Sequence, residues 1–223
     1  MKYHLKPLVG LLVNRHFSAG SMILYQGEVP RAACILIRGV VKVYSISAKG
    51  EEHIILFNVA GDIFPTPWIF GKTSGTIFFY EALTDCTVAY VQRKQLLDYM
   101  HKNTERLSTL LDYISTNYSA SLMRINALEQ PKAFDKLVFT LYFLCKRYGK
   151  SKLNKNKSTI PIALTHQTLA SLVGLTRETT AMEMSKLKKR KIISYKKQQY
   201  TVNIPKLQEV MGEDILSEVS ISN

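Results

Sequence analysis

The sequence of 223 residues lacks the features that mark metal-binding, disulfide-rich and membrane-spanning proteins. Its three cysteines, Cys34, Cys86 and Cys145, form no CxxC pair, so neither a zinc site nor an iron–sulfur cluster has its usual ligand spacing. An odd number of cysteines also argues against a disulfide framework. No apolar run reaches the length of a transmembrane helix. We therefore expect reduced thiols, no metal site, no membrane contact and a cytoplasmic protein.

Catalytic signatures are missing as well. No Ser/His/Asp, Cys/His or paired-carboxylate arrangement has catalytic spacing, and no glycine loop of the phosphate-binding type is present. His4, His16 and His53 leave haem binding open, but a lone histidine is more often an ordinary surface or core residue, and we assign no ligand. The sequence therefore gives no ground for an enzyme, and we identify no cofactor.

Acidic residues are scarce in one part of the chain. Residues 131–205 hold 16 Lys or Arg against 3 Asp or Glu, whereas residues 1–130 hold 13 against 10. The formal net charge of +13 therefore arises mainly in the C-terminal part. A basic surplus confined to one segment is typical of a nucleic-acid-binding surface. A membrane surface would fit the charge alone, but no basic amphipathic anchor with exposed aromatic residues accompanies it.

Within this basic segment, residues 164–191 have the pattern of two short helices joined by a tight turn. Thr165 and Thr176 are expected to cap the two helices, and Gly174 is placed to end the first because it adopts a left-handed conformation without a side-chain penalty. The inner stripe of the second helix would consist of Thr180, Met184 and Leu187. This is the pattern of a helix-turn-helix, whose second helix enters the major groove of DNA.

The outer face of the second helix carries side chains suited to base recognition. Arg177 can donate two hydrogen bonds to guanine, and Glu178 can accept one from the amino group of cytosine. Lysines follow where phosphates would pass, among them Lys186 and Lys188. The alternative is a solvated, lysine-rich amphipathic helix packed on a small domain. The charge distribution along the chain favours double-stranded DNA as the partner.

From Phe17 to about Arg93, short runs of β-branched and aromatic residues alternate with turn-forming pairs such as Gly27-Glu28 and Gly61-Asp62. The runs are residues 22–28, 33–46, 51–59 and 87–92. This spacing predicts an antiparallel barrel or jelly roll.

Between Arg93 and Leu128 the sequence has neither glycine nor proline, and its apolar residues recur at helical spacing. We expect one long helix that ends at Gln130-Pro131, because proline lacks the amide donor. A second copy of the helix is the simplest partner for so long an apolar stripe, and packing on its own barrel alone is the alternative. The residues expected to hold the dimer are Leu107, Leu111, Ile114 and Tyr118.

After Pro131 the sequence predicts an apolar helix over 134–149, a basic loop over 150–161 and a winged hairpin over 191–204. The predicted fold class is α+β. We expect three parts: an antiparallel β jelly-roll barrel over 1–92, a central dimerisation helix over 93–130 and a winged helix-turn-helix domain over 131–223.

Taken together, these segments resemble the Crp/Fnr family of bacterial transcription regulators. FSAGSMILYQGE, ILIRGVVKVYSISAKGEEHIILF and GDIF are similar to the strands and turns of its cyclic-nucleotide-binding-type domain. TRET at residues 176–179, after T-x-Q-x-L-A at residues 165–170, is similar to its helix-turn-helix. The resemblance covers residues 17–205. By this resemblance, the residues expected to contact DNA are Thr165, His166, Gln167, Thr176, Arg177, Glu178, Thr179, Met182, Lys186 and Lys188.

The resemblance implies a dimeric regulator that binds an inverted-repeat operator, with RNA polymerase as a further partner. A second hypothesis, from another class, is a ligand-binding regulatory module that acts on a protein partner. The pair Arg177-Glu178 favours the first hypothesis, because a module of the second kind needs no base-contacting pair.

The chain departs from the family in the expected effector pocket. In members that bind cyclic AMP, a Glu binds the ribose, and an Arg with a Ser or Thr binds the phosphate; the corresponding positions here are Thr66 and Thr76-Ile77. A buried phosphate without a cation is unfavourable, so we expect no regulation by cyclic AMP. The residues expected around this pocket are Thr66, Trp68, Thr76, Phe78 and Tyr80.

A second departure lies on the second helix of the helix-turn-helix. The family commonly places another Arg four residues after the Glu, whereas this chain has Met182 there. A thioether cannot donate a hydrogen bond to guanine, though it can pack against a thymine methyl group. We expect a half-site related to the family's TGTGA-like sequence and altered at one base pair.

Overall fold

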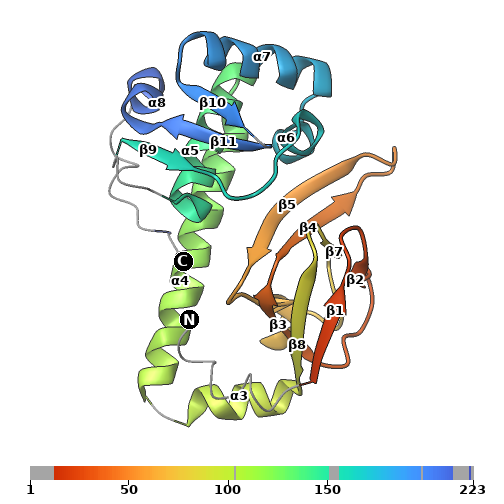
Figure 1. The fold of residues 1–223 in the computed structure, drawn as a ribbon. Helices are drawn as coiled ribbons and strands as arrows, with labels where there is room; N and C mark the ends of the chain where they lie inside the picture. The colour runs from red at the N-terminus through yellow and green to blue at the C-terminus, as the bar shows by residue number, and fades with distance from the viewer. Residues whose placement is uncertain (1–12, 103, 151–155, 197, 213–220, 222–223) are drawn as a thin grey trace. The chain divides into compact units, whose positions relative to one another are not determined.

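The computed structural model describes residues 13–102, 104–150, 156–196, 198–212 and 221. The chain forms two compact units, Met1–Tyr113 and Ile114–Asn223, whose elements are shown in Figure 1. Strands dominate the first unit and helices the second, so the predicted α+β class is confirmed. Within the described residues, every helix is too short or too polar to cross a bilayer.

The described part of the first unit contains two antiparallel sheets, each of four strands, in the orders β1-β8-β3-β6 and β2-β7-β4-β5. The strands are β1 Val13–Phe17, β2 Met22–Leu24, β3 Ala33–Arg38, β4 Val40–Ile46, β5 Glu52–Val59, β6 Ile63–Phe64, β7 Phe79–Ala82 and β8 Cys86–Val91. This is the jelly-roll arrangement that the spacing of turn signals predicts. Strands β1, β6 and β7 lie outside the predicted runs.

The side chains of β3 show how the sheets are filled. Cys34 and Leu36 belong to the cluster that joins both sheets, together with Val41 and Tyr80 of the other sheet. Successive side chains of a strand point to opposite faces, so Ile35 belongs instead to a second cluster on the outer face. We call these the inner cluster and the outer cluster. Both faces of β3 are therefore buried.

Among the described residues, helix α2 Thr66–Ile69 interrupts the strands of the first unit, and α3 Arg93–His101 and α4 Thr104–Glu129 follow them. The prediction of one long helix from Arg93 to Leu128 is wrong, because α3 ends at His101 and α4 begins at Thr104. Leu96 of α3 and Leu110 of α4 are both in the outer cluster. Two helices can turn so that both cover the same sheet, which one straight helix cannot do.

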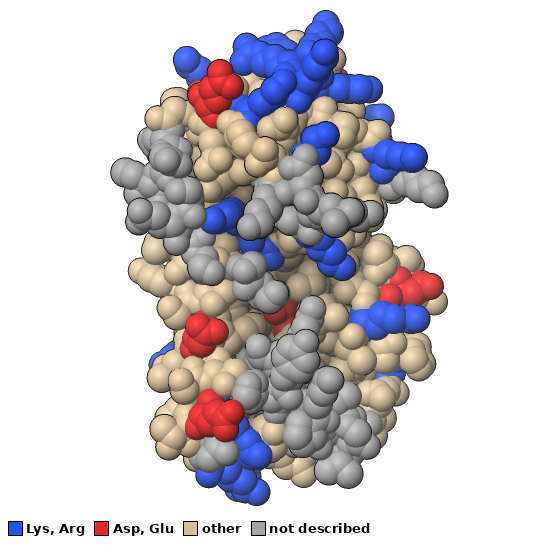
Figure 2. All heavy atoms as spheres, turned by 60° about the vertical axis from the view of Figure 1, so that its left-hand side comes forward, with Lys and Arg blue, Asp and Glu red and all other residues tan. Residues whose placement is uncertain are grey.

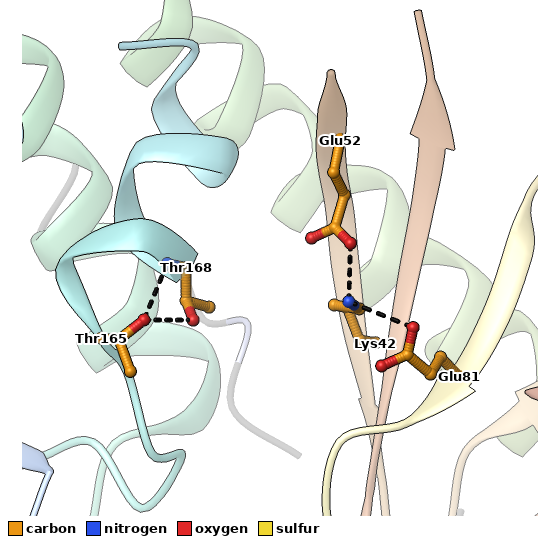
Figure 3. Close-up of polar contacts among 5 residues, drawn as sticks. All are labelled: Lys42, Glu52, Glu81, Thr165 and Thr168. Atoms are coloured by element: carbon orange, nitrogen blue, oxygen red, sulfur yellow. Dashed lines mark hydrogen bonds and ion pairs between the residues drawn. The ribbon is translucent and has the colours of Figure 1, made fainter. Parts of the chain in front are cut away.

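A buried cation joins three strands of the second sheet. Nζ of Lys42 on β4 lies 2.7 Å from a carboxylate oxygen of Glu52 on β5 and 3.3 Å from one of Glu81 on β7 (Figure 3). The same ammonium group lies 4.4 Å from the ring centroid of Tyr44. Burial and the nearby Glu81 raise the pKa of Tyr44 to about 12. The buried charge of Lys42 is thus compensated by two carboxylates and a ring.

The second unit consists of α5 Ala133–Tyr148, β9 Lys157–Thr159, α6 His166–Val173, α7 Arg177–Lys189, β10 Ile193–Lys196, β11 Gln199–Asn203 and α8 Ile204–Met211, with the C-terminal half of α4. The end of α4 at Glu129, just before Pro131, is as predicted. The strands form a sheet in the order β10-β11-β9. Part of the predicted basic loop is therefore strand β9, and its residues 151–155 lie outside the described residues.

All three thiols are buried, and this predicts their reactivity. Burial raises the pKa of Cys34 and of Cys145 to about 12 and also raises the pKa of Cys86. The thiolate is the reactive form, so at about pH 8 the native protein should resist iodoacetamide, while the unfolded protein is alkylated at all three positions.

The same pKa shifts predict a loss of stability in alkali. Above the ordinary thiol pKa of 9.0 the unfolded chain releases these protons and the native chain retains them, so the urea midpoint should fall as the pH rises from 9.0 towards 12.

Mass spectrometry of protein treated with iodoacetamide measures the reactivity of the three thiols. Rapid native-state alkylation of Cys34 or Cys145 would contradict the buried placement.

Candidate DNA-binding site

Helices α6 and α7 begin and end at the residues that the sequence predicts. The hydroxyl of Thr165 accepts a hydrogen bond from the backbone N–H of Thr168 at 3.0 Å (Figure 3), and that of Thr176 accepts one from the N–H of Thr179 at 3.1 Å. Gly174 ends α6 in the left-handed conformation, with φ of 67°. Figure 1 shows the consequence, with α6 placed at one end of α7. The two helices form the predicted helix-turn-helix.

Helix α7 buries one face and exposes the other. Thr180, Met184 and Leu187 are buried, as the predicted inner stripe requires. Arg177 and Glu178 are exposed in the first turn, and Met182 has an exposed fraction of 55%. Glu178 also lies near the positive end of the helix dipole, which favours a carboxylate there. The side chains expected to contact bases therefore share one exposed face. The remaining expected contacts are Thr165 and Gln167, which are exposed, and His166 and Thr179, which are half-buried.

The lysines at the end of α7 differ in their surroundings. Lys186 is held by Glu183, at 2.7 Å between Nζ and the carboxylate, and Glu183 is buried although the sequence pattern did not place it inside. Lys188 and Lys189 are exposed. Figure 2 shows blue Lys and Arg side chains gathered at the top of the view, where Figure 1 draws α7. The exposed face of α7 thus lies within a basic surface.

The predicted wing is present as the hairpin β10-β11. The backbone N–H of Leu164, just before α6, donates to the carbonyl oxygen of Gln198 at 3.0 Å, which ties the wing to the start of the helix-turn-helix. Tyr195 packs against Tyr200 with ring centroids 4.5 Å apart and keeps an exposed fraction of 45%. Sequence reasoning did not identify Tyr195 as an exposed aromatic residue of the wing. Its strand neighbours Ser194 and Lys196 are exposed too, so no alternation of buried and exposed residues distinguishes it.

Comparison with known protein families gives two matches. Residues 14–103 match a family described as the cyclic nucleotide-binding domain, and residues 135–210 match one described as the Crp-like helix-turn-helix domain. Together they cover most of the chain in the order barrel, then helix-turn-helix. The chain belongs to the Crp/Fnr family of transcription regulators. It is a transcription regulator with a helix-turn-helix DNA-binding domain, and the family is not one of enzymes.

Curated relatives support this assignment. The nitrogen fixation regulation protein FixK of Rhizobium meliloti is 24% identical over 188 residues, which are 84% of this chain and 81% of the relative. The HTH-type transcriptional regulator ArcR of Staphylococcus haemolyticus is 29% identical over 178 residues, 79% of this chain and 76% of the relative. The alternative of a module acting only on a protein partner is not favoured.

Solved structures show the same fold. A transcriptional regulator of the CRP/FNR family from Thermus thermophilus superposes with a TM-score of 0.67 at 21% identity, over 90% of this chain and 99% of that one. Crp-like regulators of this kind bind DNA and dimerise.

The residues expected around the effector pocket pack in different parts of the barrel. Phe78 and Tyr80 pack in the inner cluster, where Tyr80 stacks on Phe64 with centroids 5.3 Å apart. Trp68 packs against the outer cluster. The hydroxyl of Thr66 donates to the carbonyl oxygen of Ile63 at 3.1 Å.

No candidate ligand set for a metal emerges from the described residues, in which no three His, Cys, Asp or Glu side chains cluster. His16 is exposed and lies 3.1 Å from the hydroxyl of Thr87, and His53 is half-buried on β5. His4 lies outside the described residues.

The cap of α7 yields a stability prediction. Thr176→Ala removes the acceptor for the N–H of Thr179 and should lower the free energy of unfolding by about 1 kcal/mol. Ser185→Ala, on the exposed face of the same helix, should change it by less than about 0.5 kcal/mol. Urea denaturation of both variants beside the wild type is the measurement. Equal midpoints for all three proteins would show that the cap contributes nothing.

Proposed function

We propose that the protein binds, as a dimer, an inverted-repeat operator whose half-sites are contacted by the exposed face of α7, and that cyclic AMP does not regulate it. RNA polymerase is the further partner in this proposal, because a transcription regulator of this family acts on promoters. The observation that carries the proposal is the pair Arg177-Glu178, exposed in the first turn of a capped helix inside a basic surface.

Each side chain of that face has a separate role in the proposal. Arg177 donates to a guanine, and Glu178 accepts from a cytosine amino group. Met182 packs against a base without donating a hydrogen bond, which changes the preference at one base pair. Lys188 contacts phosphate and adds affinity without sequence preference.

The dimer is supported by an unpaired apolar stripe on α4. Leu107, Leu111, Ile114 and Tyr118 are exposed, the last with an exposed fraction of 64%. The stripe continues to Leu122 and Ile125, which are also exposed. Leu110 and Met123, two other apolar residues of α4, are buried. A seam of this spacing fits a second copy of the same helix.

The absence of cyclic AMP regulation is supported by what occupies the phosphate position. Thr76 is buried, and its hydroxyl donates to the carbonyl oxygen of Tyr25. Its backbone N–H donates to the carbonyl oxygen of Glu28 at 2.8 Å, and its carbonyl oxygen accepts from the N–H of Gly27 at 2.8 Å. The groups of Thr76 that could hold a phosphate are thus bonded to residues 25–28.

No arginine stands nearby in sequence to replace the missing one. Residues 61–92 contain none. Arg93 follows, but its Nε donates to the carbonyl oxygen of Ile69 at 2.8 Å, and its guanidinium lies 5.6 Å from the ring centroid of Trp68. A cyclic nucleotide bound there would therefore bury its phosphate without the arginine that compensates its charge in the cyclic-AMP-binding members.

Selection of bound duplexes from a random pool tests the operator and its contacts. The wild type should select an inverted repeat with half-site centres about 10 base pairs apart, because two-fold protein symmetry imposes two-fold DNA symmetry. Arg177→Ala should lose about 1–3 kcal/mol and loosen the preference at one guanine. Met182→Arg should gain a preference for a G·C pair. Lys188→Ala should weaken binding to all sequences alike and lower the salt dependence by about one ion.

Two results would reject this assignment. A selected motif without two-fold symmetry would reject the dimeric operator complex. The same motif for the wild type, Arg177→Ala and Met182→Arg would reject the exposed face of α7 as the base-contacting surface.

Cyclic AMP should neither bind nor change DNA affinity. Calorimetric titration of the full-length protein should show no heat of binding at micromolar nucleotide, and operator affinity should be the same with and without it. Micromolar binding in the titration would show that residues 25–28 leave the position and that another group neutralises the phosphate.

A further inference from the structure

A buried arginine connects α4 to the helix-turn-helix. Arg124, in the C-terminal half of α4, has an exposed fraction of only 8%. Its guanidinium donates a hydrogen bond to the backbone carbonyl oxygen of Leu172 in α6. Burial lowers the pKa of Arg124 to about 10, so the side chain stays charged at neutral pH. A buried cation needs hydrogen-bond acceptors at fixed positions, so this contact fixes the position of Leu172 relative to α4.

The acceptor lies at a sensitive point of the motif. Leu172 is in the last turn of α6, where backbone carbonyl groups have no partner within the helix and the helix dipole is negative. The guanidinium of Arg124 donates a charge-assisted hydrogen bond to this carbonyl group and places a positive charge at the negative end of the helix dipole. Gly174 and the cap Thr176 follow almost at once, so the position of Leu172 relative to α4 sets where α7 begins.

A second buried arginine attaches the same half of α4 to α5. Arg147 of α5 donates to the side-chain oxygen of Asn117 on α4 at 2.7 Å, and to the carbonyl oxygen of Ile221 at 3.2 Å. Asn117 and Arg124 are about two helical turns apart, so the two contacts are separated by about 10 Å along α4. Two contacts at that separation oppose both sliding and rotation of α4 against the rest of its unit.

The contacts with α5 and α6 leave the apolar stripe of α4 free. At about 100° per residue, Asn117 and Arg124 project from one face, and Tyr118, Leu122 and Ile125 project from another. The second face is the exposed one. The same stretch of helix therefore holds the helix-turn-helix on one side and offers a surface to a second copy on the other.

We propose that Arg124 and Arg147 are positioning residues that set the spacing between operator half-sites, by fixing each α7 to the dimerisation stretch of α4. This inference rests on the proposed dimer bound to an inverted repeat. Adding one base pair between half-sites moves one of them by about 3.4 Å and rotates it by about 35°. If α7 is rigidly attached to α4, the dimer cannot contact both half-sites after that change and loses affinity. If the attachment is loose, α7 can move with the half-site and affinity is kept.

The test measures the affinity of full-length protein for the selected operator and for operators with one base pair more or fewer between unchanged half-sites. The wild type should lose about tenfold or more on either change. Arg124→Met keeps an apolar stem without the donor, and it should lose less than about threefold on the same change. Asn117→Ala removes the acceptor of Arg147 on α4 and should loosen the spacing preference in the same direction.

Arg106→Met is the matched control. Arg106 lies on the same helix, but its guanidinium packs over Tyr99, at 3.9 Å from the ring centroid, in the first unit. This variant should keep the wild-type spacing preference. The selected half-site sequence should be unchanged in every variant, because no side chain on the exposed face of α7 is altered.

The outcomes separate this inference from the function on which it rests. Failure of the wild type to select an inverted repeat rejects the proposed function. An inverted repeat with wild-type spacing preference in both Arg124→Met and Asn117→Ala rejects the positioning role alone. If Arg124 and Arg147 were purely structural, the variants would have a lower unfolding midpoint and an unchanged spacing preference. That result would also reject the positioning role. Where Arg124→Met does not fold, Arg124→Lys and Asn117→Ala decide, since each alters one contact more mildly.

Discussion

The contact between the guanidinium of Arg124 and the last turn of α6 is the interaction on which the second unit depends. A helix end buried in protein needs donors for its free carbonyl groups, and the buried guanidinium of Arg124 supplies one to Leu172. Because Gly174 turns the chain directly into α7, the exposed face of α7 takes its direction from α4. In the proposed complex, DNA recognition and dimer formation use different surfaces, and α4 connects the two.

Helix α4 therefore packs against different elements along its length. Near its start, Leu110 and Tyr113 join the outer cluster of the barrel, where the Tyr113 hydroxyl lies 3.4 Å from the backbone N–H of Ile63. Further along, Asn117 and Arg124 attach it to the winged helix-turn-helix unit. What remains exposed is a continuous apolar stripe. A change in the packing of the outer cluster would act on α4 directly at its first turns.

The barrel keeps the family's fold, while the residues at its expected effector pocket differ from those of the cyclic-AMP-binding members. Both sheets and the turns between them follow the family pattern, yet Thr76 is bonded to residues 25–28 and Arg93 to the end of α2. In the proposed function, these contacts occupy polar groups that could otherwise bind a nucleotide phosphate. Fold alone therefore does not assign an effector to this barrel. The family membership describes its architecture and its DNA-binding domain.

Sequence alone determined the elements whose signals are local. Thr165, Gly174 and Thr176 mark the ends of α6 and α7 because caps and left-handed glycines act within a few residues, and Pro131 ends α4 for the same reason. Only the tertiary structure divided the apolar positions of α4 into buried and exposed faces, and separated α3 from α4 where no Gly or Pro marks a break. Those outcomes, like the partners of Arg124 and Arg147, depend on segments distant in sequence, and helical periodicity carries no information about which neighbour a face will meet.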